Sequence, residues 1–181
     1  MHIKTGYKVS DAMTEKPITV APITTVKECS KIMSSKHVGS MLVIDRSALV
    51  GILTEQDIVR KVVAEGKDSG KTKVKDIMNT ELITIKPDAD IYDALVVMRD
   101  KNIRHLPVIF KNKLVGYVTI KDILKIEPQL FEIIAEKIEL QRKGIRHDSD
   151  GGICDACGKF NEELYTIEGL LYCDNCKRKK R

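Results

Sequence analysis

Apolar residues recur with two spacings along the first two-thirds of the chain, and each spacing predicts one kind of secondary structure. Short apolar runs bounded by turn-forming residues indicate strands. Longer stretches carry apolar residues three and four positions apart, as on one face of a helix. The pattern predicts strands at 18–20, 40–44, 49–53, 83–85, 106–109 and 114–118, and helices at 26–33, 55–65, 91–98 and from 121 onward.

The same order of elements occurs twice. Shifting the sequence by 65 residues aligns 9–58 with 74–123 without a gap, and the match is closest where 49–51 aligns with 114–116. A register kept over so many positions indicates two copies of one β-α-β-β-α unit. Capping signals precede the first helix of both copies, Thr25 with Glu28 and Asp90 with Asp93. A turn at 110–113 joins the last two strands of the second copy.

A division of the chain follows from these repeats and from the composition of the segments between them. A helix is expected after Pro128, with Leu130, Ile133, Ile134 and Ile138 forming one apolar stripe that packs either on the repeats or on a second copy of the chain. The expected parts are repeat 1 (1–65), a linker (66–73), repeat 2 (74–127), a connecting helix (128–143), a second linker (144–152) and a small cysteine-rich domain with a basic tail (153–181).

Each copy carries the motif Gly-x-x-Thr-x-x-Asp where its last strand passes into a helix. The motif residues are Gly51, Thr54, Asp57, Gly116, Thr119 and Asp122. One interpretation is helix capping, in which the threonine and the acid satisfy the first backbone N–H groups. The other is nucleotide binding, in which the threonine contacts phosphate at the helix start, the aspartate accepts from a ribose hydroxyl, and the glycine admits the ligand. Recurrence of the glycine favours nucleotide binding.

The duplicated unit with its motif resembles a pair of CBS domains, often called a Bateman module, over about residues 9–125. The resemblance implies a mixed α/β (α+β) fold with pseudo-twofold symmetry and two clefts for adenosine-containing ligands such as AMP, ADP, ATP or S-adenosylmethionine. It also implies a homodimer formed through the repeats.

Roles for single residues follow from the same resemblance. Asp57 and Asp122 would hold ribose, and Thr54 and Thr119 would contact phosphate or the nearby ribose. The adenine pocket would be lined by Ile18, Thr19, Ile83 and Thr84, and phosphate would be contacted by Arg104 and His105. The first copy has Gly39 and Ser40 in place of that basic pair, which predicts unequal affinity of the two clefts.

Four of the five cysteines fall in the C-terminal domain, as Cys154, Cys157, Cys173 and Cys176. Two C-x-x-C pairs at this separation predict a closed four-sulfur metal site, structural rather than catalytic. The segment resembles a zinc ribbon and also rubredoxin, so zinc is favoured and iron is the alternative. Cys29 instead lies on the apolar face of a predicted helix and is expected in the core.

Composition limits the functions that remain. The net charge of +5 arises in residues 1–143, because acidic and basic residues balance after that point. No apolar run reaches the length of a membrane span, the start of the chain has no signal-like stretch, and cytoplasmic residence is expected. The basic run 177–181 is either a solvated tail or an arm for nucleic acid.

The sequence contains no catalytic constellation, so we expect a regulatory protein rather than an enzyme. Its predicted function is to sense an adenine nucleotide and to signal through the metal-binding domain to a protein partner. The alternatives are nucleotide-gated electron transfer by rubredoxin-like iron, and nucleic-acid binding.

Overall fold

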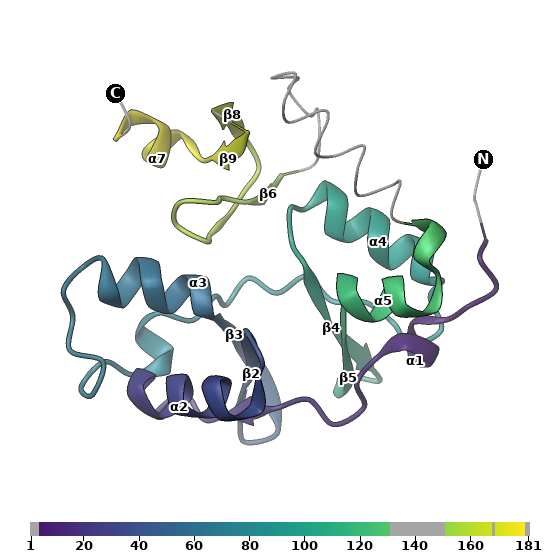
Figure 1. Cartoon of the computed structure of the whole chain (residues 1–181), viewed down its shortest axis with the longest axis horizontal. Helices are drawn as coiled ribbons and strands as arrows, with labels where there is room; N and C mark the ends of the chain where they lie inside the picture. The colour runs from purple at the N-terminus through teal and green to yellow at the C-terminus, as the bar shows by residue number, and fades with distance from the viewer. Residues whose placement is uncertain (1–3, 131–150, 168, 180–181) are drawn as a thin grey trace. The chain divides into compact units, whose positions relative to one another are not determined.

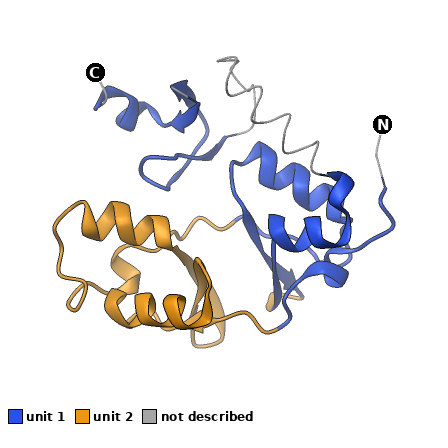
Figure 2. Cartoon of the chain, viewed as in Figure 1, with its two compact units in different colours: residues 1–15, 83–110, 115–181 blue, residues 16–82, 111–114 orange. Residues whose placement is uncertain are grey.

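The structure is a computed structural model of the chain, and it describes residues 4–130, 151–167 and 169–179 (Figure 1). The chain divides into two compact units (Figure 2). Unit 1 comprises residues 1–15, 83–110 and 115–181, and unit 2 comprises residues 16–82 and 111–114. In the described part of the chain, no helix is both long and apolar enough to span a membrane.

Unit 2 contains a three-stranded sheet with the strand order β1-β2-β3. β1 runs parallel to β2, and β2 pairs antiparallel with β3. The strands are β1 (Thr19–Val20), β2 (Ser40–Asp45) and β3 (Ala48–Thr54); the helices are α2 (Val26–Lys36), α3 (Glu55–Ile58), a π-helical continuation (Val59–Val63) and a 3-10 turn (Val74–Asp76). Apolar side chains from α2 and the sheet form its core, and Cys29 is fully buried among them as predicted.

Most of the second repeat lies in unit 1, together with α1 (Val9–Ala12) from the start of the first repeat. The elements of the second repeat there are α4 (Ile91–Asp100), β4 (His105–Phe110), β5 (Lys113–Thr119, whose first two residues count with unit 2), α5 (Ile120–Ile126) and a 3-10 turn (Pro128–Leu130). The turn at 110–113 is confirmed, and Lys111 and Asn112 adopt the positive φ angles that a tight hairpin requires. Of the predicted connecting helix, the residues after Leu130 lie outside the described residues.

The strand predicted at 83–85 is reduced to one bridge between Ile85 and Val108. In the first repeat, the N–H of Leu42 donates to the carbonyl of Ile18, at 3.2 Å. The residue equivalent to Leu42 in the second repeat is Pro107, which has no N–H to donate. The proline therefore shortens the ladder, and the prediction of a full strand there is wrong.

The segment that leads into each repeat bonds to the other repeat. Val9 N–H donates to the carbonyl of Ala89 at 2.8 Å, and Val74 N–H donates to the carbonyl of Thr24 at 2.9 Å. These positions correspond under the 65-residue shift, so the exchange is symmetric in sequence. The sequence analysis did not predict the short helices α1 and 74–76 that these segments form.

Candidate functional site

The threonine and aspartate of each motif form a capping box. In the second repeat, Thr119 is the N-cap of α5 and its hydroxyl accepts from the N–H of Asp122, at 3.3 Å. Oδ2 of Asp122 accepts from the N–H of Thr119 at 3.1 Å and from its hydroxyl at 2.6 Å. Thr54 and Asp57 repeat this arrangement at 3.2, 3.0 and 2.6 Å. The capping interpretation is therefore confirmed for both copies, and the cap occupies only Oδ2 of each carboxylate.

The two aspartates differ in what contacts their second oxygen. Lys61 Nζ lies 2.8 Å from Oδ1 of Asp57, and Asn79 Nδ2 donates to the same carboxylate at 3.2 Å and 3.3 Å. Oδ1 of Asp122 has the ammonium of Lys125 at 4.0 Å. The Asp57 side chain is 4% exposed and that of Asp122 is 22% exposed. Asp57 is thus enclosed by the protein, whereas Asp122 is open on one side.

The motif glycines are close to a methionine. A Cβ placed on Gly51 would lie 2.5 Å from Sδ of Met78, and a Cβ on Gly116 would collide with Sδ of Met13. Both methionines belong to the segments that are exchanged between the repeats. The close approach that the sequence analysis assigned to a ligand is made by the protein's own thioether groups.

The residues assigned to adenine lie on and near the first strand of each repeat. The side chains of Ile18 and Ile83 pack against the core of their own unit, whereas Thr19 and Thr84 are exposed.

The two residues assigned to phosphate, Arg104 and His105, lie beside the start of α5. The carbonyl of Arg104 accepts from the N–H of Ile120, at 3.0 Å, and its side chain is exposed. The His105 ring lies 5.7 Å from the Tyr117 ring, centroid to centroid. The backbone of Arg104 is therefore hydrogen-bonded to the residue that follows Thr119.

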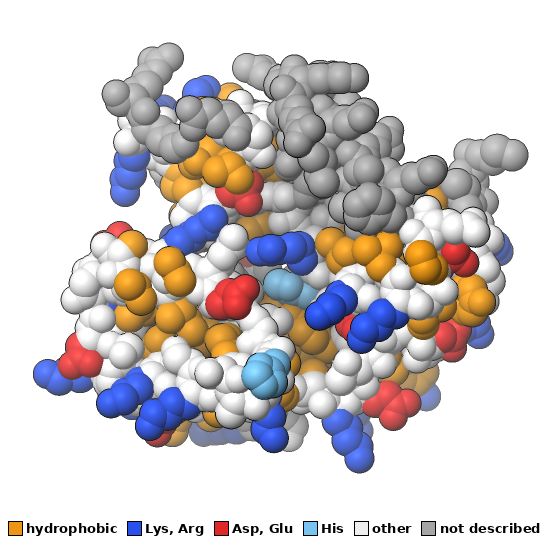
Figure 3. Space-filling view, in the orientation of Figure 1, with side chains coloured by type: hydrophobic (Ala, Val, Ile, Leu, Met, Phe, Trp, Pro, Cys, Tyr) orange, Lys and Arg blue, Asp and Glu red, His pale blue; other side chains and the backbone are white. Residues whose placement is uncertain are grey.

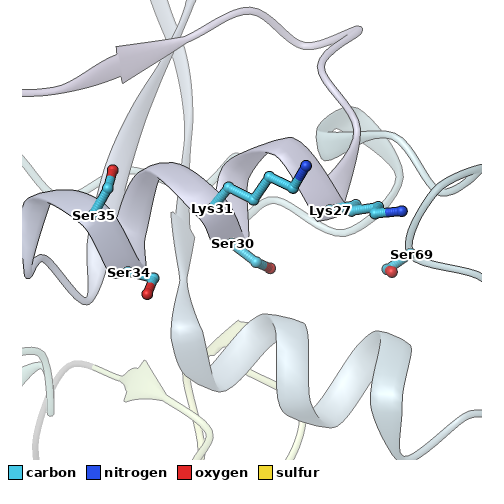
Figure 4. A pocket seen from close by; sticks show the side chains of 6 residues that line it. All are labelled: Lys27, Ser30, Lys31, Ser34, Ser35 and Ser69. Atoms are coloured by element: carbon cyan, nitrogen blue, oxygen red, sulfur yellow. The ribbon is translucent and has the colours of Figure 1, made fainter.

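A separate hollow of about 440 Å³ lies along α2 in unit 2, and its lining includes Lys27, Lys31 and Ser69 (Figure 4). Figure 4 shows the serine hydroxyls and lysine amines of α2 along this open surface. No residue that the sequence analysis assigned to nucleotide binding lines it.

The four C-terminal cysteines come together in unit 1. Their sulfur atoms all lie within 4.8 Å of one another, and Sγ of Cys157 is 3.9 Å from Sγ of Cys173. Tetrahedral coordination with Zn–S bonds of about 2.3 Å needs sulfur atoms roughly 3.8 Å apart. A slight contraction would give that geometry, so the donor set fits one four-coordinate ion.

The two cysteine pairs are presented by different structures. The elements of the domain are β6 (Gly152–Ile153), β7 (Phe160–Asn161), β8 (Tyr165–Ile167), β9 (Leu170–Tyr172) and α7 (Asp174–Arg178). Cys154 and Cys157 lie in the turn between β6 and β7, where Gly158 adopts φ +70° and donates its N–H to the carbonyl of Cys154. Cys173 is the N-cap residue of α7, so the second pair lies at a helix start.

Burial acts to raise the pKa of three of these thiols, and at Cys154 backbone hydrogen bonds outweigh it. Burial raises the pKa of Cys157 and of Cys176 above the ordinary thiol value. Burial also acts to raise the pKa of Cys154, but N–H donors including that of Cys173, 3.3 Å from its sulfur, hold that pKa below the ordinary value. A backbone that donates to sulfur is suited to a thiolate ligand.

In the described part of the basic tail, Lys177 and Arg178 contact other residues of the cysteine domain. The Lys177 ammonium lies 3.5 Å from the centroid of the Tyr165 ring, and Arg178 forms an ion pair with Asp174, at 2.7 Å. Residues 180–181 lie outside the described residues. Figure 3 shows lysine and arginine side chains at several places on one face of the described residues.

Comparison with known proteins identifies the repeats. The CBS domain family matches residues 9–64 and 74–128. The chain belongs to the CBS-domain family. An uncharacterized protein of Methanopyrus kandleri, MK0525, is 34% identical over 178 residues, covering 94% of this chain and 91% of its own length. The similarity to this relative therefore extends beyond the repeats, into the cysteine-rich segment.

Solved structures, one of them of a CBS domain pair, show the same fold. An uncharacterized conserved protein from Pyrococcus horikoshii matches with TM-score 0.63 and 33% identity, over 70% of this chain and 94% of that one. The CBS domain pair of protein MJ0100, solved with 5′-methylthioadenosine and S-adenosylmethionine, matches with TM-score 0.61 and 28% identity, over 68% and 97%. The predicted CBS tandem fold is confirmed.

Sequence reasoning missed Lys61 and Asn79 as partners of Asp57. A signal was present, since the aligned copies differ at both positions: Ile126 corresponds to Lys61, and Thr14 corresponds to Asn79. Aligning the copies for their differences, as well as for their identities, would have singled these residues out.

Proposed function

We propose that this chain is a regulatory protein that binds an adenosine-containing ligand through its CBS pair and signals through its four-cysteine domain. The observation that carries this proposal is the likeness to the CBS pair of MJ0100, which is solved with two adenosine derivatives. The chain's own residues support it, because the cap on Asp122 leaves Oδ1 facing a partly exposed side. A carboxylate oxygen in that position suits a ribose hydroxyl donor.

The CBS pattern offers one candidate position in each repeat. The proposed ligand contacts are ribose on Asp57 or Asp122, ribose or phosphate on Thr54 or Thr119, adenine near Ile18, Thr19, Ile83 and Thr84, and phosphate on Arg104 and His105. We also propose that the boundaries of the repeats and linkers are those drawn from the sequence, and that the repeats form a homodimer.

The four cysteines would hold a structural zinc ion. Four thiolates close the coordination sphere, so the ion has no open position for catalysis and would supply folding stability to a domain with a small core. This donor set also suits iron, whose bound form absorbs visible light, whereas zinc-bound protein is colourless. Reduced thiols arranged for a metal fit a cytoplasmic location.

Hydrogen bonds within unit 1 give a route from the CBS fold to this domain. The N–H of Ile153 in β6 donates to the carbonyl of Lys101, at 2.9 Å, and Asn102 Nδ2 donates to the carbonyl of Ile153, at 3.2 Å. Lys101 follows α4 directly, so a ligand that shifts the second repeat would move an anchor of the metal domain. A protein partner would read that change.

Isothermal titration calorimetry of the purified full chain with AMP, ATP and S-adenosylmethionine tests the proposal. At least one should bind with measurable heat, and the double variant Asp57→Asn/Asp122→Asn should abolish that heat. Absence of binding for all three, or unchanged binding by the folded double variant, would contradict a nucleotide-sensing function.

A further inference from the structure

We propose that the first repeat is closed by the protein's own Lys61 and Asn79, and that each chain binds one phosphate-bearing adenine nucleotide, at Asp122 in the second repeat. This inference rests on the proposed function and states which of its two candidate positions is used.

Lys61 occupies the place at Asp57 that a ligand hydroxyl would need. Its Nζ is 2.8 Å from Oδ1 of Asp57, the oxygen that the capping box leaves unused. Asn79 Nδ2 also donates to this oxygen at 3.2 Å, and the Asp57 side chain is 4% exposed, so a ligand hydroxyl could reach the oxygen only by displacing one of these two groups. Displacement of the ammonium would leave a largely buried cation without its carboxylate, which strongly opposes ligand entry.

Other contacts hold Lys61 in that position. Its ammonium also donates to the carbonyl of Ile77 and to Oδ1 of Asn79, both at 2.8 Å. Asn79 is fixed in turn by two backbone hydrogen bonds with Ile52, at 2.9 and 3.0 Å. The Lys61 side chain is only 21% exposed. The cation is therefore part of a connected buried network and not a mobile surface group.

The second repeat cannot form this network. The residue equivalent to Lys61 is Ile126, and the residue equivalent to Asn79 is Thr14. The cation near Asp122 is Lys125, whose side chain is 69% exposed and whose Nζ lies 4.0 Å from Oδ1. An exposed lysine at that distance can move aside, or contact a phosphate, at little cost.

The two repeats also differ in the charge of the residues that would lie near a bound phosphate. In the first repeat, the Glu55 carboxylate lies over Gly39, where an added Cβ would meet it at 3.0 Å. In the second repeat, Ile120 replaces Glu55 and Arg104 replaces Gly39. A phosphate would meet a carboxylate in the first repeat and a guanidinium in the second. We therefore expect the second repeat to prefer AMP or ATP over the cationic S-adenosylmethionine.

Calorimetric titration of the full chain with AMP, using variants matched between repeats, tests the inference. Wild type should bind one AMP per chain, and more tightly than S-adenosylmethionine. Asp122→Asn should weaken binding roughly 10- to 100-fold, as for loss of a hydrogen bond to a charged group, whereas Asp57→Asn should leave the dissociation constant within about threefold.

Asp57→Asn can destabilise unit 2, so variants of two exposed residues, Arg104 and Glu55, provide a second comparison. Arg104→Ala should weaken AMP binding about tenfold, and Glu55→Ala should leave it unchanged. Two AMP per chain, equal losses from the two aspartate variants, or tighter binding of S-adenosylmethionine would overturn the inference while leaving the proposed function intact. No binding of AMP, ATP or S-adenosylmethionine would refute the proposed function and this inference with it.

Discussion

The carboxylate of Asp90 accepts two hydrogen bonds from Thr5, a residue 85 positions earlier in the chain. The Thr5 hydroxyl donates to Oδ1 at 2.7 Å and the Thr5 N–H donates to Oδ2 at 3.0 Å. Asp90 is also the N-cap of α4, where it accepts from the N–H of Tyr92, at 2.8 Å. One side chain therefore begins a helix and ties the N-terminal segment to it. Its cap differs from the predicted box with Asp93, since the Asp90 carboxylate accepts from the N–H of Tyr92.

The Asp90 contacts predict a pH dependence of stability. Partial burial acts to raise the pKa of Asp90, but its hydrogen-bond donors outweigh burial and hold that pKa below the ordinary value of 3.8. The stabilisation is therefore complete above about pH 3.8 and is lost as the pH falls through the lower folded-state pKa. Asp90→Asn should cost about 1 kcal/mol at pH 7. Urea unfolding from pH 7 to pH 3 checks this, and a wild-type-to-variant difference that does not shrink at low pH would contradict it.

The ion pair in the first repeat predicts unequal costs for the two motif aspartates. Asp57→Ala removes a cap and leaves the Lys61 ammonium without its carboxylate, so it should lower the free energy of unfolding by about 3–5 kcal/mol. Asp122→Ala should cost about 1 kcal/mol, as for a lost cap.

A double-mutant cycle isolates the ion-pair contribution to these costs. Lys61→Met combined with Asp57→Ala should recover part of the loss, because the unpaired charge is removed. Equal costs for Asp57→Ala and Asp122→Ala, measured by chemical denaturation, would show that Lys61 adds nothing.

The motif glycines should tolerate no side chain while the methionines remain. Gly51→Ala should destabilise the protein by about 1–3 kcal/mol through overpacking against Met78, and Gly116→Ala should do the same against Met13. Pairing Gly51→Ala with Met78→Ala should cost less than the sum of the single changes, whereas pairing it with Met13→Ala should be additive. Thermal unfolding of these variants measures the coupling, and additivity for both pairs would refute the packing explanation.

Metal removal should unfold the cysteine domain and leave the repeats folded. Chelation, or Cys173→Ser, should abolish the dispersed amide signals of residues 151–179 in NMR spectra, because the ion supplies most of that domain's stability. Cys29→Ala is the matched control: this cysteine is buried in unit 2 with its pKa raised to about 11 by burial, so the variant should keep one metal per chain. A chelated domain that stays ordered would contradict a structural metal.

Much of the fold could be predicted from the sequence, because apolar spacing and helix capping depend on neighbouring residues and because both patterns occur in each repeat. The strands at 40–44 and 114–118 and the cap at Thr25 follow from spacing and capping chemistry, and the structure confirms them. The missing strand at 83–85 depends on Pro107, which is distant in sequence and acts by lacking one donor. A prediction that treats each segment alone cannot include that effect.

The candidate site was less predictable because long-range packing shapes it. The sequence identified Asp57 as a motif residue, but burial by Asn79 depends on a segment 22 positions away that is exchanged between repeats. The glycines were correctly identified as positions of close approach, but the group that approaches comes from Met13 and Met78. Such contacts appear only once the chain is folded. The cysteine spacing, by contrast, was sufficient to predict a shared four-sulfur site.

Native mass spectrometry of the purified full chain with saturating AMP tests the central claim most directly, since it counts ligands and ions on the same molecule. We predict one metal ion and one AMP on every chain, whatever the number of chains in the assembly. Spectra that show the metal but no AMP, ATP or S-adenosylmethionine at any concentration tried would contradict the claim that this protein senses adenine nucleotides.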